Sequence, residues 1–205
     1  TIVAIGAIFN KDNGNNSGHV RVYQLIDGTW SKLGLDIDGE AEGDQSGISV
    51  SMNSAGDIVA IGAINATNKV GVKTGHVRVY KNINGTWTQI GSDIDGEAKG
   101  DYSSDAISLS YSGDIVAIGA PRNDGTGDNA GHVRIYKNIS GTWTQIGSDI
   151  DGESAGDYFG FSVSLSDDGE VLAVGGIYNA GGGGVNNKKG HVRAYKNVNG
   201  TWTQI

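Results

Sequence analysis

Apolar and polar residues alternate along short stretches of the chain, in a pattern typical of β-strands. In 161–166 (FSVSLS) the apolar side chains fall on one face and the serines on the other, as in a strand with one buried face. Stretches of a second kind, at 2–7, 58–63 and 115–120, are almost continuously apolar. Such runs predict strands that are buried on both faces. The two patterns together predict an all-β chain.

In each complete copy, an alternating stretch and an apolar stretch form strands one and two, and two more predicted strands follow them. In the last copy the four strands are expected at 161–166, 171–176, 191–195 and 201–205. Strands three and four are joined by Asn-Gly, Asp-Gly or Ser-Gly, a pattern typical of two-residue hairpin turns with positive φ. These turns are expected at 27–28, 84–85, 140–141 and 199–200. Fifteen strands are predicted in all, because the chain opens at strand two of its first copy.

The pattern recurs at a period of 57, 56 and 59 residues, in two series that keep step: Trp30, Trp87, Trp143 and Trp202, and His19, His76, His132 and His191. A repeat of this size with four strands predicts one blade of a β-propeller. We expect a single propeller region over 1–205, built from four-stranded antiparallel blades at about 1–44, 45–101, 102–157 and 158–205. Three blades are complete and the first lacks its first strand. An open blade edge is a liability, so we expect part of a longer chain or an oligomer that shares blades.

Composition narrows the classes of partner. The chain has 35 glycines, one proline, no cysteine and a formal net charge of −8 at pH 7. The negative charge disfavours nucleic acid and anionic membrane as partners. The lack of cysteine excludes disulfides and thiolate metal sites. No stretch approaches the roughly 20 apolar residues that span a bilayer, and since the chain begins without methionine we expect its natural start to lie upstream.

Carboxylates gather in a loop that follows strand four in three copies. Alternating carboxylates around a glycine offer the hard oxygen ligands that Ca²⁺ prefers. The candidate calcium ligands are Asp36, Asp38, Glu40 and Asp44 in the first copy, Asp93, Asp95, Glu97 and Asp101 in the second, and Asp149, Asp151, Glu153 and Asp157 in the third. The alternative is that they accept backbone N–H groups and cap the turn into the next blade.

Histidine and arginine share a face of strand three in every copy, since they stand two residues apart. Four equivalent positions favour a repeated hydrogen-bonding device over a catalytic base, because a catalytic site is built once from groups that differ. The repeated tryptophans and tyrosines favour packing between blades over sugar stacking. No nucleophile elbow, phosphate loop or metalloprotease motif is present. We therefore expect no catalytic residue.

Phe159-Gly160 followed by Ser162-Val163-Ser164, and Gly119-Ala120-Pro121 at the end of strand two, resemble the two halves of the FG-GAP repeat of integrin-α-type propellers. The wider pattern is similar to tandem repeats of large secreted bacterial surface proteins. The resemblance implies adhesion and ligand recognition, and it does not imply an enzyme. The calcium site of integrin-type repeats, between strands one and two, does not carry over, because that connection is short and poor in carboxylates here.

These observations favour a non-catalytic binding or adhesion scaffold that is extracellular or on a bacterial cell surface. Its partner is expected to be a protein or glycan ligand on a surface, or copies of itself. Ligand residues are expected in the variable loops between strands two and three, at Asn123, Asp124, Asp128, Asn129, Tyr178, Asn179, Asn186 and Asn187. A structural subunit that completes its open blade in an oligomer or filament is the alternative. A propeller hydrolase is the third hypothesis, and it requires a cluster of acids and bases confined to one blade.

Overall fold

A computed structural model describes residues 1–180 and 188–205, and they form four antiparallel β-sheets with no helix among them. The all-β prediction is confirmed. The first sheet holds β1 (Ile2–Ala7), β2 (His19–Ile26), β3 (Thr29–Lys32) and β4 (Ile37–Asp38). The second holds β5 (Val50–Met52), β6 (Ile58–Ala63), β7 (His76–Ile83), β8 (Thr86–Gln89) and β9 (Ile94–Asp95). The third holds β10 (Ala106–Leu109), β11 (Ile115–Ala120), β12 (His132–Ile139), β13 (Thr142–Gln145) and β14 (Ile150–Asp151). The fourth holds β15 (Phe159–Leu165), β16 (Val171–Gly176), β17 (His191–Val198) and β18 (Thr201–Gln204).

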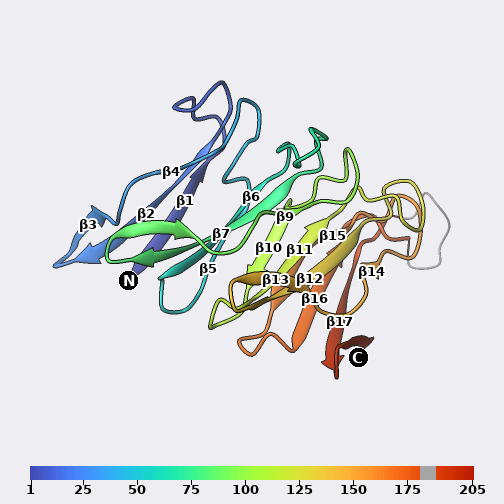
Figure 1. Cartoon of the computed structure of the whole chain (residues 1–205). Helices are drawn as coiled ribbons and strands as arrows, with labels where there is room; N and C mark the ends of the chain where they lie inside the picture. The colour runs from blue at the N-terminus through green and yellow to red at the C-terminus, as the bar shows by residue number, and fades with distance from the viewer. Residues whose placement is uncertain (181–187) are drawn as a thin grey trace.

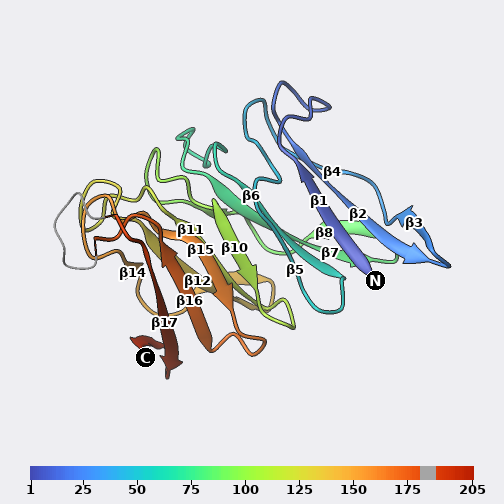
Figure 2. The same ribbon diagram turned by 180° about the vertical axis from the view of Figure 1, so that it is seen from behind.

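The strands of each sheet follow one another in chain order, as in β5-β6-β7-β8, and the first sheet has no counterpart of β5. The four sheets lie side by side in a row, from the N-terminal sheet at one end to the C-terminal sheet at the other (Figure 1, with the reverse side in Figure 2). This propeller-like arrangement matches the order of the repeats along the chain.

The prediction of fifteen strands is wrong, because residues 1–180 and 188–205 alone hold eighteen. The additional strands β4, β9 and β14 are two residues long, and they pair with the first residues of β2, β7 and β12, as Asp38 does with His19. Each begins with an isoleucine that is buried in the core (Ile37, Ile94 and Ile150). Two residues are too few for an alternating pattern to reveal them.

The hairpin turns follow the prediction. The first turn residues, Asp27, Asn84, Ser140 and Asn199, have φ of 48°, 52°, 52° and 53°, and each is followed by a glycine with positive φ. The second turn is further held by Asn82, whose side-chain oxygen accepts the N–H of Gly85 at 2.9 Å. Local chemistry therefore sets the register between strands three and four.

The core lies between adjacent sheets. At the first junction, Val20 and Val22 of the first sheet pack with Val59 and Ile61 of the second, and all four are buried. Equivalent clusters fill the second and third junctions. Since each inner sheet has a neighbour on both faces, the apolar runs β6 and β11 are buried along their whole length, as predicted.

The tryptophans of the outer strands tie each sheet to the one before it. The indole Nε1 of Trp87 donates to the Leu33 carbonyl at 2.8 Å, and Trp143 and Trp202 donate to Ile90 and Ile146 in the same way. These contacts match the expected packing role, because each indole crosses a junction between sheets.

Replacement of Ile135 by alanine should reveal how much one junction contributes. Ile135 is fully buried between sheets, whereas Ile139 on the same strand is 55% exposed near the hairpin turn. We expect Ile135→Ala to lower the free energy of unfolding by about 3 kcal/mol, because it leaves a cavity, and Ile139→Ala to lower it by less than about 1 kcal/mol. Urea unfolding measures both, and equal losses would contradict this account of the core.

Candidate functional site

The four histidines stand at the first residue of β2, β7, β12 and β17, next to the long loops. The acidic loops pack against these long loops; in the first repeat the N–H of Gly43 donates to the Asn15 carbonyl at 2.8 Å. Within the described residues, His19, His76 and His132 each join a cluster with carboxylates. These clusters therefore lie along one edge of the row of sheets (Figure 1).

Two of the clusters cross a junction between sheets. Glu40, from the acidic loop of the first sheet, lies with His76 and Asp93 of the second, and their ligand atoms are all within 4.8 Å of one another. Arg78 Nη1 lies 3.4 Å from Glu40 Oε1, and Arg78 Nη2 donates to the Asp38 carbonyl at 2.7 Å. Arg78 therefore contacts both a side chain and a backbone carbonyl of the first sheet's acidic segment and ties that segment to the second sheet.

The next junction repeats this arrangement with Glu97, His132 and Asp149. Arg134 lies 3.5 Å from Glu97 and donates to the Asp95 carbonyl at 2.9 Å. In the fourth sheet Arg193 forms an ion pair with Glu153. The arginines thus tie each acidic loop to the next sheet.

Burial first, and the neighbouring arginine second, lower the pKa of His76 and of His132 to about 4, against the opposing effect of Asp93 or Asp149. The two imidazoles are therefore neutral at pH 7. Because these clusters repeat and carry a bridging arginine, they fit a role in joining the sheets.

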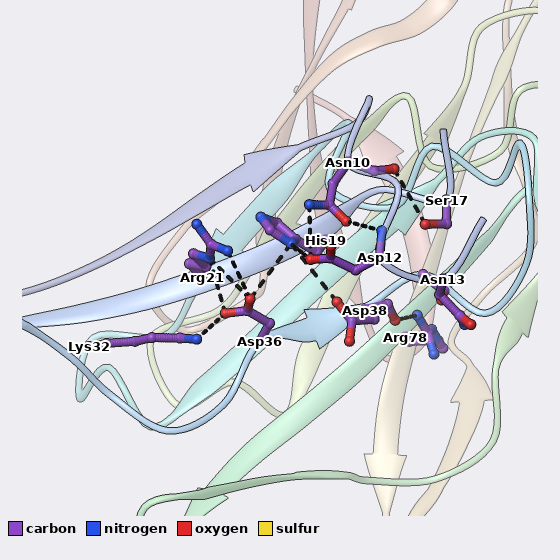
Figure 3. Close-up of polar contacts among 11 residues, drawn as sticks. Asn10, Asp12, Asn13, Ser17, His19, Arg21, Lys32, Asp36, Asp38 and Arg78 are labelled. Atoms are coloured by element: carbon purple, nitrogen blue, oxygen red, sulfur yellow. Dashed lines mark hydrogen bonds and ion pairs between the residues drawn. The ribbon is translucent and has the colours of Figure 1, made fainter. Parts of the chain in front are cut away.

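The first sheet carries a cluster of a different composition. His19 Nδ1 lies 3.7 Å from Asp12 Oδ2, 3.8 Å from Asp36 Oδ2 and 3.9 Å from Asp38 Oδ1. Figure 3 shows the three carboxylates directed toward the imidazole, with Asp12 coming from the loop between β1 and β2. His19 is 4% exposed, and its Nδ1 has no hydrogen-bond partner. Three acids thus converge on one buried imidazole nitrogen.

Two cations hold Asp36 in this cluster. Arg21 Nη2 donates to Asp36 Oδ2 at 3.0 Å, and Lys32 forms an ion pair with the other oxygen. These contacts, that of Arg21 foremost, lower the pKa of Asp36 to about 2. Unlike Arg78, which pairs with Glu40 of the preceding sheet, Arg21 bonds an acid of its own sheet.

The loop side chains also position Asp12. The Asn10 amide donates to Asp12 Oδ2 at 3.1 Å, and the Asn10 side-chain oxygen accepts the N–H of Asp12 at 2.8 Å (Figure 3). The carboxylate is therefore directed toward His19 by its own loop.

Asp12 and Lys32 distinguish the first repeat from the others. Seven residues before the histidine, the second and third repeats have Lys69 and Gly125 in place of an acid. At the position of Lys32 the others have glutamine; Gln89, for example, donates to Asp93 at 2.7 Å. Sequence analysis missed both residues, although Asp12 is the single acid of residues 8–18.

The acidic loops are not arranged as four converging carboxylates. The last acid of each loop, Asp44, Asp101 or Asp157, is buried and accepts the backbone N–H three residues before it, at 2.8, 3.1 and 3.0 Å. Burial raises the pKa of Asp44, Asp95 and Asp151. Asp36, Asp38, Glu40, Asp93, Glu97 and Asp149 join histidine clusters instead. Calcium binding by these loops stays a prediction.

The expected ligand residues take part in loop contacts. Asn123 and Asn179 are buried, and their amides donate to Asp101 and Asp157 of the preceding repeat at 2.9 and 2.8 Å. The side chain of Asp124 accepts the N–H of Asn129, and Asp128 accepts its side-chain amide. The ring of Tyr178 packs edge-on against that of Tyr158. Asn186 and Asn187 lie outside the described residues, and ligand binding by these loops stays a prediction.

No protein-family model and no curated protein matches this sequence. Solved structures do match it. A Bacteroides uniformis protein provisionally described as a 6-phosphogluconolactonase has a TM-score of 0.59 at 13% identity, over 96% of this chain and 48% of its own. The periplasmic gluconolactonase PpgL of Pseudomonas aeruginosa has a TM-score of 0.54 at 14% identity, over 95% and 49%. A Bacteroides fragilis protein, also provisionally described as a 6-phosphogluconolactonase, has 0.52 at 15%, over 98% and 52%.

This chain spans about half the length of the structures that it matches. At these identities the likeness shows the fold, and the fold is one on which lactonases are described. The prediction of a non-catalytic adhesion scaffold is therefore wrong, as is the expectation that the chain is not an enzyme. The interpretation of the chain as an adhesion protein with FG-GAP repeats conflicts with these descriptions. Whether the chain is related to FG-GAP proteins stays untested. In the part of the chain that the structure describes, no helix has the length and apolar character needed to cross a membrane.

The two junction histidines should make the protein acid-sensitive. Below pH 6.5 the unfolded chain takes up protons on His76 and His132, whereas the folded chain does so only near pH 4. Stability is therefore fully present above pH 6.5 and is lost as the pH falls toward 4. Between pH 7 and 5 we expect a loss of about 2 kcal/mol for each histidine.

Urea unfolding of the native protein and of His132→Gln at pH 7 and pH 5 measures this effect. The variant should lose less stability than the native protein on acidification, and the difference isolates His132 from the carboxylates that also titrate. An identical pH dependence in the two proteins would show that this imidazole does not titrate as described.

Proposed function

We propose that this chain is part of a β-propeller hydrolase that opens the ring of a sugar lactone, with the Asp12, His19, Asp36 and Asp38 cluster as its reaction centre. The observation that carries the proposal is that, among the described residues, the first repeat alone gathers four such groups, where the second and third junctions gather three. A cluster of that kind is what distinguishes a catalytic site from a repeated structural contact. The lactonase descriptions of the structures with this fold support the choice of substrate class.

The cluster combines the groups that ester hydrolysis needs. The side chains of Asp12 and Asp38 are 61% and 44% exposed, so a water molecule and a substrate reach them, while His19 lies buried beneath. One of these carboxylates takes the proton from water as the new C–O bond forms at the lactone carbonyl. Arg21 and Lys32, which are partly exposed, stabilise the negative charge that develops on the carbonyl oxygen. The ring C–O bond then breaks, and the proton passes to the ring oxygen.

We further propose that the four sheets are the blades 1–44, 45–101, 102–157 and 158–205 of a closed propeller. Val3 and Ile5 of the first sheet are 36% and 51% exposed, although their counterparts Val59 and Ile61 are buried against the preceding sheet. At the other end of the row Val192 is 73% exposed, although its counterpart Val20 is fully buried against the following sheet. The two ends therefore present the two complementary halves of the same junction.

A second copy of the chain is the partner that fits these two ends. Its fourth sheet offers the apolar face that the first sheet lacks, and its first sheet covers Val192 in return. Both junctions would be of the kind that the chain already forms three times internally.

We place the protein outside the cytoplasm, at the surface or in the periplasm of a bacterium. The fold is compatible with that location, because one of the similar structures is a periplasmic gluconolactonase. The absence of cysteine is compatible with it as well.

Lactone hydrolysis tests the proposed activity directly. The native chain should open glucono-δ-lactone or its 6-phosphate, followed by proton release at neutral pH. Asp12→Asn and Asp38→Asn should each lower kcat by about 100-fold, because each removes a proton acceptor. Asp128→Asn is the matched control, since Asp128 is an exposed loop acid outside the cluster. Activity that survives in both cluster variants would remove the cluster from the reaction.

Light scattering over a range of concentrations tests the shared propeller. A protein of these 205 residues should have a mass of twice 21.2 kDa, and Val192→Asp should give a monomer, because a charge enters an apolar junction. Val198→Asp is the control, since Val198 is exposed near a hairpin turn, as Ile83 and Ile139 are in their repeats. A native mass of 21.2 kDa at every concentration contradicts self-association.

A further inference from the structure

We propose that Asp12, His19, Asp36 and Asp38 bind one divalent transition-metal ion, Zn²⁺ in preference to Ca²⁺. This inference deepens the proposed function, on which its catalytic meaning rests, but metal binding at the cluster is measurable without any assay of activity. The four residues are brought together by β2, by β4 and the residues before it, and by the loop between β1 and β2.

The spacing of the four ligand atoms fits a small cation. Ligand atoms that surround Zn²⁺ tetrahedrally at about 2.0–2.2 Å lie about 3.3–3.6 Å from one another. The three carboxylate oxygens lie 3.7, 3.8 and 3.9 Å from His19 Nδ1, and all four atoms are within 4.8 Å of one another. The three nitrogen–oxygen distances exceed the tetrahedral spacing by only a few tenths of an ångström.

The unpartnered nitrogen of His19 points independently to a ligand. Its Nδ1 is buried and makes no hydrogen bond, although it is directed at three carboxylate oxygens (Figure 3). A buried polar atom without a partner is energetically unfavourable. An ion among these atoms satisfies the nitrogen and neutralises the mutual repulsion of the carboxylates at the same time.

The surroundings of the cluster are those of a metal site with an outer shell. Arg21 and Lys32 bond Asp36, and Asn10 bonds Asp12, so both carboxylates are oriented by partners outside the ligand set. Three carboxylates and two cationic side chains leave one formal negative charge. A divalent cation therefore enters a site of favourable charge.

The clusters of the two later junctions provide an internal comparison. Each offers three ligand groups, and in each the glutamate, Glu40 or Glu97, lies against a buried arginine that crosses the junction. That guanidinium occupies the charge position that a cation would take. We therefore assign the ion to the cluster of the first sheet and not to its counterparts.

The donor set selects the metal. Imidazole nitrogen suits Zn²⁺ and other transition metals, whereas Ca²⁺ takes six to eight oxygen ligands. The cluster offers four ligand groups, fewer than the six to eight that Ca²⁺ takes, and one of them is an imidazole nitrogen. When bound, the ion would supply a water molecule of lowered pKa to the carboxylates of the cluster.

Isothermal titration calorimetry of the EDTA-treated native chain with Zn²⁺ tests the site. We expect one high-affinity ion per chain with a Kd of about 1 µM or tighter, and a rise in Tm with added Zn²⁺. Asp12→Asn and His19→Ala should weaken binding at least about 100-fold. Asp12 is the safer variant for folding, because its side chain is exposed. A tenfold excess of Ca²⁺ should not displace Zn²⁺.

His132→Ala is the matched control, because His132 is equally buried but lies in a three-ligand cluster. It should leave the Zn²⁺ affinity unchanged. Absence of a Zn²⁺ isotherm, an equal loss in His132→Ala, or full affinity in Asp12→Asn each overturns the metal site. Zn²⁺ binding without lactone hydrolysis refutes the proposed function alone, and hydrolysis that persists in EDTA and depends on Asp12 refutes the metal alone.

Discussion

The rest of the structure depends on the packing of one sheet face against the next. A single sheet of this chain has apolar residues on both faces, and Val59 and Ile61 become buried only because Val20 and Val22 of the neighbouring sheet cover them. Burial of such side chains contributes about 1.5–3 kcal/mol each, so a lone repeat has too small a core to be stable. One repeat of the sequence therefore corresponds to one junction between sheets. The turns serve to bring each strand of the repeat back into that packed layer.

The junction also decides what the polar residues at its edge do. Where a sheet has a predecessor, its arginine crosses to the acidic loop of that predecessor, as Arg78 does to Glu40 and the Asp38 carbonyl. In the first sheet, Arg21 bonds Asp36 of its own sheet instead. The same residue at the same position in the repeat thus joins sheets in one place and orients an acid in another. The role of this arginine therefore depends on the residues that lie beside it and not on the arginine itself.

Features with a period or a strong local signal were predictable from the sequence. The all-β class, the order of the strands and the Asn-Gly type turns all follow from alternation, apolar runs and positive φ. The strands β4, β9 and β14 were not predictable, because two paired residues leave no pattern. The convergence of the cluster was not predictable either, since Asp12 lies in a loop whose length varies between repeats and its distance from Asp36 is set by the sheet. The prediction of a non-catalytic scaffold was wrong because it was based on the residues that all the repeats share.

Departures from the repeat carry the functional information instead. Natural repeats keep the residues that every junction needs, so a position that changes in one copy is free of that constraint or serves another purpose. Asp12 and Lys32 are two such changes, and they are 20 residues apart in the sequence. Unrelated substitutions have no reason to lie close together in space. Asp12 nevertheless lies against His19, and Lys32 bonds Asp36, which lies against the same imidazole. The convergence of both changes on one imidazole favours a site that the first repeat acquired for chemistry over a variant of the structural contact that the other repeats retain.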